Sequence, residues 1–197
     1  MKNTTICILL LFSIFVFAQT NQTSKQFQDD LNFEYADKTK SPLTEADFEV
    51  FKSLDFFEID TKFIVQAKFK KSKKEKVFEM KTTTNRLPKY IKYGEIEFEI
   101  NNKIYKLNVY QNLDLIKNQT YQDYLFLPFL DLTNGNQSYV GGRYIDLKIP
   151  NNNTIEIDFN KAYNPYCAYS DRYSCPIVPV VNNLQIAILA GVKKFHD

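Results

Sequence analysis

EIEFEINNKIYKLNVY, residues 95–110, has the alternation of a β-hairpin that buries one face. Apolar side chains alternate with glutamates in the first half, and the alternation resumes from Tyr105 in the second half. Asn101 and Asn102 separate the halves, and asparagine tolerates the positive φ of a tight turn. A two-residue loop fixes the register, which places Phe98 opposite Tyr105, Ile96 opposite Leu107, and Glu97 opposite Lys106.

Outward from this hairpin, alternating apolar residues predict further strands over residues 63–70, 77–81, 124–131, 139–148, 154–158 and 184–190. Apolar residues at every fourth position predict a helix over residues 24–36, and Thr44 with Asp47 resembles the N-cap of a short second helix. Strands and helices do not alternate. We therefore expect a mainly β protein, either an antiparallel β-sandwich or a partly open barrel, with one or two short N-terminal helices.

The N-terminal residues 1–18 have the layout of a secretory signal peptide, with Lys2 before an apolar run and Ala18 at the cleavage position. The apolar run is shorter than the roughly 20 residues that span a bilayer. We expect an exported protein, periplasmic or extracellular, without a membrane span. Residues 19–197 have the length of one domain, which we expect to be β-rich.

The charge is nearly balanced, with 25 basic and 23 acidic residues. A nucleic-acid binder usually carries a basic surplus on one face, so we expect no nucleic-acid partner. The densest basic run contains six lysines within residues 68–76. We interpret it as the solvated tip of a hairpin, with contact to an anionic surface as the alternative.

Several kinds of catalytic site are missing from the sequence. The only histidine, His196, is next to the last residue, which argues against Ser-His-Asp catalysis, Cys-His catalysis and histidine metal sites. Gly141 and Gly142 lack the strand-to-helix context of a phosphate-binding loop, so we interpret them as shaping the backbone or as the floor of a ligand site. We expect no cofactor and no metal, and the balance is against an enzyme.

Cys167 and Cys175 are the only cysteines after the predicted signal peptide. A disulfide is the expected state of such a pair in an exported protein, and free thiols are the alternative. Two thiolates alone are too few for a zinc site, which normally has four ligands.

Polar residues at strand ends are the candidates for ligand contacts, because binding groups concentrate in loops on a rigid scaffold. They are Asp131, Thr133, Tyr139, Arg143, Asp158, Asn160, Tyr163 and Asn164. The preferred hypothesis is that a pocket near Arg143 binds a small polar or anionic ligand, or a partner segment. One alternative is a hydrolase that uses Asp131 and Asp158 as a carboxylate pair. Another is a purely structural envelope protein, in which these side chains only cap turns and Arg143 neutralises a partly buried aspartate.

Two long runs carry a resemblance to a known family: LFLPFLDLTNGNQSYVGGRYIDL, residues 125–147, and DFNKAYNPYCAYSDRYSCPIVPVVNNLQIAILAG, residues 158–191. Both resemble signature blocks of the domain-of-unknown-function family numbered 1684. The resemblance implies no activity and assigns no functional residues. Three positions that tend to be acidic in that family are neutral here, at Gln137, Asn182 and Val192.

Overall fold

The computed structural model describes residues 24–196, so the predicted signal peptide, residues 1–18, lies outside the described residues. Seven strands form one sheet. They are β1 (Ile64–Lys71), β2 (Phe78–Glu79), β3 (Lys89–Ile100), β4 (Lys103–Asn112), β5 (Tyr124–Phe129), β6 (Arg143–Lys148) and β7 (Thr154–Asp158). The described residues also contain six 3₁₀ turns, of which only the second and third lie between strands: η1 (Thr61–Phe63), η2 (Leu115–Lys117), η3 (Gln119–Tyr121), η4 (Phe159–Lys161), η5 (Tyr166–Ala168) and η6 (Val180–Asn182).

The β3–β4 hairpin has the predicted register. Phe98 pairs with Tyr105, Ile96 with Leu107, and Glu97 with Lys106. Asn101 and Asn102 adopt φ values of 53° and 59°, as a tight turn between twisted strands requires. On the exposed face the ammonium of Lys106 lies 3.1 Å from the carboxylate of Glu97. The alternation of apolar and charged residues therefore determines both faces of the hairpin.

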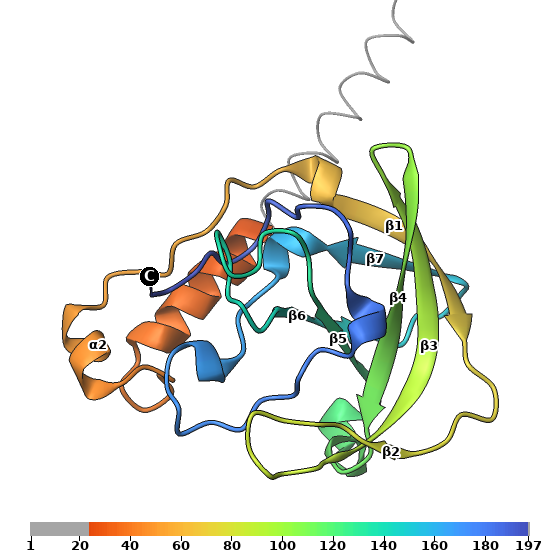
Figure 1. Cartoon of the computed structure of the whole chain (residues 1–197), viewed down its shortest axis with the longest axis horizontal. Coiled ribbons are helices and arrows are strands. Elements are labelled where there is room, and N and C mark those ends of the chain that lie inside the picture. Colours follow the sequence, from red (N-terminus) through yellow and green to blue (C-terminus); the bar gives the residue numbers. More distant parts are fainter. Residues whose placement is uncertain (1–23, 197) are drawn as a thin grey trace, which may run out of the picture.

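All strand pairs are antiparallel, in the order β6-β5-β4-β3-β1-β7, and β2 pairs with β3 beside this path. The sheet curls into a half-barrel, which confirms the prediction of a mainly β fold and matches the partly open barrel of the two predicted alternatives. Figure 1 shows the long β3–β4 hairpin on one side of the molecule and the helices on the other.

Each face of the sheet packs against a separate core. The inner face carries the main core, which includes Ile96, Leu107, Leu127 and Ile157. The opposite face carries a smaller and mostly aromatic cluster, made of Met80, Tyr90, Tyr110, Phe126, Tyr144 and Val178. In β5 the alternating side chains divide between these two cores, so this strand is buried on both faces. In β6 only the first three residues are buried, and Asp146 and Lys148 are exposed.

The two predicted helices are present. The first covers residues 24–36 and the second is α2 (Glu45–Val50), where the hydroxyl of Thr44 accepts a hydrogen bond from the backbone N–H of Asp47 at 3.1 Å. Tyr35, Leu43 and Tyr169 belong to a third core that joins the helical region to the end of the chain. In Figure 1 the blue C-terminal segment runs from the strands back to the helices.

The strand predicted over residues 184–190 is wrong, because this segment has no regular strand partner. Two backbone hydrogen bonds hold its N-terminal part: the N–H of Leu184 donates to the carbonyl of residue 130, and the carbonyl of Ile186 accepts from the N–H of residue 132. The carbonyls of Ile188 and Ala190 accept hydrogen bonds from Arg143 instead of from a neighbouring strand. The segment therefore covers the inner core as an irregular strap.

The strand predicted over residues 139–148 begins only at Arg143. Gly142 adopts φ +89°, and a Cβ there would lie 2.6 Å from the carbonyl oxygen of Phe129. Only glycine fits this combination of φ and close backbone approach. Gly142 therefore shapes the backbone, and the turn at residues 139–142 aims Arg143 into the core.

The six lysines of residues 68–76 are all solvent-exposed, as predicted for a charge run. Lys68, Lys70 and Lys71 lie in β1, and the other three lie in the loop before β2. Because β2 pairs with β3 and not with β1, the prediction that this run forms the tip of a hairpin is wrong. Across residues 24–196, no helix is long and apolar enough to cross a membrane.

Candidate functional site

Arg143 lies at the centre of a buried network rather than at a pocket. Its side chain is fully buried, and its Nη2 donates to the carboxylate of Asp131 at 2.7 Å and to the carbonyl of Ile188 at 2.8 Å. Nη1 donates to the carbonyl of Ala190. Thr133 completes the network, because its backbone N–H donates to Asp131. This guanidinium fastens the C-terminal strap to β6.

Asp158 and Asn160 form a second network, at the end of β7. The hydroxyl of Ser24 donates to Asp158 at 2.6 Å, and the backbone N–H of Asn160 donates to the same carboxylate at 3.0 Å. Gln28 donates to the carbonyl of Asn160. The hydrogen bonds of Asp158 and Asp131 go to different residues, and both carboxylates are almost completely buried. This arrangement favours structural roles for both.

The other three candidates lie apart from these networks. The amide of Asn164 donates to the carbonyl of Lys193, at the end of the chain. The ring of Tyr139 lies close to Gly141. Tyr163 extends the sheet beyond β6, because its backbone exchanges two hydrogen bonds with Tyr144, at 2.9 and 3.0 Å. Among the eight candidates, Tyr163 lines a large cavity.

That cavity has a volume of about 440 Å³ and lies over the aromatic face of β3, β5 and β6. We call it the tyrosine cleft. Its lining side chains include Phe27, Leu31, Glu34, Tyr90, Tyr124, Phe126, Tyr144, Asp146, Tyr163, Tyr166 and Tyr173. The helix over residues 24–36 supplies one wall, the sheet supplies the floor, and the loop from Pro165 to Pro176, here called the cysteine loop, supplies the other wall. Its size suits a small organic molecule.

Asp146 is the polar centre of the cleft. The hydroxyls of Tyr163 and Tyr124 donate to its Oδ1, at 2.6 and 2.7 Å. The surrounding protein removes part of the hydration of this carboxylate and raises the pKa of Asp146, while the two tyrosine hydrogen bonds lower it. The side chain nevertheless stays accessible to solvent. Burial, followed by the charge of Asp146, raises the pKa of Tyr124 and Tyr163, so both phenols are protonated near neutral pH.

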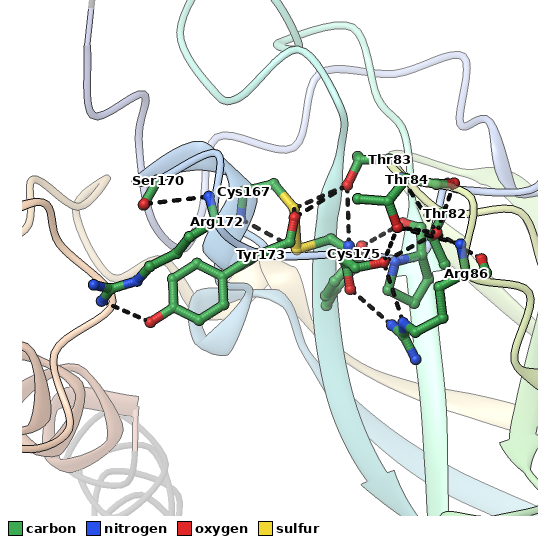
Figure 2. The surroundings of a disulfide bond; sticks show 12 residues. Thr82, Thr83, Thr84, Arg86, Cys167, Ser170, Arg172, Tyr173 and Cys175 are labelled. Carbon is green, nitrogen blue, oxygen red and sulfur yellow. Dashed lines mark hydrogen bonds between the residues drawn. A yellow bond between two sulfur atoms is a disulfide. The ribbon is translucent and has the colours of Figure 1, made fainter.

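The cysteine loop is held in place by its cysteine pair and by hydrogen bonds to the segment between β2 and β3. Cys167 and Cys175 lie at disulfide-bonding distance, with their Cα atoms 6.1 Å apart. Figure 2 shows three consecutive threonines, residues 82–84, facing this pair, and Thr83 accepts a hydrogen bond from the backbone N–H of Cys175. The guanidinium of Arg86 donates to the carbonyl of Ser174 at 2.7 Å. These links hold one wall of the cleft against the β2–β3 region.

Two residues central to the cleft were missed by the sequence analysis. Asp146 follows the alternation of residues 143–147, in which Arg143 and Ile145 face the inner core while Tyr144 and Asp146 face the other side. The alternation could have indicated a site, because it places the carboxylate of Asp146 beside Tyr144 on the face of the strand that points away from the inner core. Tyr124 carries no such signal, because its contact with Asp146 depends on the pairing of β5 with β6.

The polar groups at the centre of the cleft are a carboxylate and two phenols. Within residues 24–196, no group of three or more His, Cys, Asp or Glu side chains is placed to hold a metal ion. A single carboxylate with two phenol donors supplies one charged acceptor for a ligand, surrounded by ring surface.

Comparisons with known proteins give the family setting. A model of the family described as "Protein of unknown function (DUF1684)" matches residues 49–193, which include all seven strands and the cysteine loop. The solution NMR structure of an uncharacterized protein of Haloarcula marismortui is similar, with 28% identity and a TM-score of 0.70. The alignment covers 90% of this chain and 95% of that chain. No curated protein matches this chain.

Proposed function

We propose a ligand-binding function for this chain, which belongs to the DUF1684 family of proteins of unknown function. The observation that carries the proposal is the tyrosine cleft, in which a solvent-accessible carboxylate lies among aromatic side chains in a cavity of about 440 Å³. Binding sites for small molecules combine mostly apolar walls with a few placed polar groups. The cleft lies on the face of β6 opposite to Arg143, whose Nη1 and Nη2 groups donate to internal acceptors.

A titration followed by two-dimensional ¹H–¹⁵N NMR tests the proposal. The probes are a panel of small quaternary ammonium compounds, aromatic amines, sugars and carboxylic acids, each added to the folded protein. We expect one probe class to shift the amide signals of residues 124–126, 144–146 and 163–176, the segments that carry the lining side chains of the sheet and the cysteine loop. Signals from the hairpin tip at residues 100–103 are the internal control. Shifts that are absent for every probe class would contradict the proposal and favour a structural protein.

The proposal includes export. The signal-like residues 1–18 and the cysteine pair at disulfide distance both suit an oxidising compartment. Mass spectrometry of the protein from its source cells should give a chain that begins at Gln19, with Cys167 and Cys175 joined. Closing so short a loop contributes about 2 to 3 kcal/mol in the chain-entropy view, so reductant should lower stability by that amount. An uncleaved chain with free thiols would contradict export.

A further inference from the structure

We propose that the ligand of the tyrosine cleft is an organic cation, bound with its ammonium group beside Asp146. The inference rests on the proposed function, because it specifies the chemical class that this cleft takes. Three properties of the cleft support it: the sign of its charge, the free oxygen of Asp146, and the arrangement of its rings.

The lining residues carry negative charge only. Asp146 lies on the floor and Glu34 lies on the helical wall, whereas no lysine, arginine or histidine is among the described residues that line the cleft. Arg86 lies beside the cysteine loop and Arg172 lies within it, but both are held by backbone carbonyls: Arg86 by that of Ser174, and Arg172 by those of residues 41 and 43. The low-dielectric walls strengthen the field of the two carboxylates inside the cleft.

Asp146 has one oxygen available for a ligand. Both tyrosine hydroxyls donate to Oδ1, and Oδ2 has no hydrogen bond within the part of the chain that the structure describes. The two phenols fix the plane of the carboxylate, which leaves Oδ2 as a preset acceptor. A bound ammonium group would meet this oxygen without first displacing a protein donor.

The rings around Asp146 are suited to a cation. Phe126 and Tyr144 are nearly perpendicular, with centroids 4.7 Å apart, and Tyr144 and Tyr163 are perpendicular at 5.9 Å. The walls therefore offer ring faces in more than one direction. Ring faces attract a cation electrostatically, by about 0.5 to 2 kcal/mol for each favourable contact. A cavity of about 440 Å³ is large enough for a substituted ammonium group and part of its carrier.

Choline and its uncharged isostere, 3,3-dimethyl-1-butanol, provide the test. The two molecules have nearly the same shape and differ in the charge of the central atom. We expect choline to bind in the cleft at least about tenfold more tightly, which corresponds to about 1.4 kcal/mol. The readout is an NMR titration of the full mature chain, followed at the signals of residues 144–146 and 163–176.

The Asp146→Asn variant sharpens the test because its amide oxygen can still accept both tyrosine hydrogen bonds. The charge is lost together with the free acceptor Oδ2, which becomes an NH2 group, so the fold should be unchanged while the affinity for choline falls about tenfold or more. The matched control is Glu99→Gln, which removes one charge at an exposed position of β3 and should leave choline binding unchanged. A second variant, Tyr166→Leu, removes a half-exposed ring and should weaken choline binding about threefold.

The possible outcomes separate the two proposals. Equal binding of choline and its isostere, or choline binding that Asp146→Asn leaves intact, overturns the cation inference while the cleft remains a binding site. Cleft signals that shift only with carboxylic acids or sugars have the same meaning. Cleft signals that no probe class shifts overturn the proposed function itself.

Discussion

Replacing Arg143 with methionine should lower the free energy of unfolding by about 3 to 5 kcal/mol, because the change leaves Asp131 charged and unpaired inside the protein. The side chains of both residues are completely buried, so water cannot replace the lost partner. The carbonyls of Ile188 and Ala190 lose their donor at the same time. Urea denaturation followed by circular dichroism measures the loss.

Two further variants show whether the buried charge is responsible. Lys117→Met removes an exposed ion pair with Asp114 and should cost no more than about 1 kcal/mol. The double variant Arg143→Met with Asp131→Asn should recover part of the loss, because no uncompensated charge remains in the core. An Arg143→Met protein as stable as Lys117→Met would contradict the structural role and return Arg143 to the candidates for ligand binding.

Replacing Phe159 with alanine should also destabilise the protein by about 3 to 5 kcal/mol, since it opens a cavity in the inner core. The Phe159 ring is fully buried and packs against Phe98 at 5.5 Å and Phe129 at 5.3 Å, measured between ring centroids. It therefore joins the end of β7 to both halves of the sheet. The matched control is Phe33→Ala, whose side chain is 72% exposed on a helix and should cost less than about 0.5 kcal/mol.

Thermal and urea unfolding of both phenylalanine variants provide the comparison. A loss of similar size in the two variants would mean that Phe159 is not a central core residue. A loss confined to Phe159→Ala would support the inner core as the main source of stability. Tyrosine fluorescence offers a second probe, because the sequence has 13 tyrosines and no tryptophan.

Much of the fold could be predicted because local patterns decide it. The hairpin at residues 95–110 has a period of two and a turn of two asparagines, and these features alone fix its register. The helix at residues 24–36 likewise follows from its spacing of apolar residues. The strap at residues 184–190 has the same apolar composition as a strand. Its backbone partners are a guanidinium and isolated loop groups, which no local pattern indicates.

The candidate site was harder to predict for a related reason. Polar residues at strand ends were reasonable candidates for ligand contacts. Four of them instead form hydrogen bonds inside the protein, Arg143 with Asp131 and Asn160 with Asp158. The solvent-accessible carboxylate is that of Asp146, which lies within β6. Its hydrogen-bond donors are Tyr124 on β5 and Tyr163 after β7. Such a site depends on which faces of distant segments meet, and this information appears only with the tertiary fold.

The strap, residues 184–192, also determines when the inner face of the sheet can be covered during synthesis. Its hydrogen bonds to Arg143 join residues 45 to 49 positions apart, and it follows all seven strands in the sequence. Because synthesis proceeds from the N-terminus, every strand leaves the ribosome before the residues that cover the inner face. Until residues 184–192 arrive, that face remains in contact with water and Arg143 has no carbonyls to bind. The inner face can therefore be covered only after all seven strands and residues 184–192 have been made.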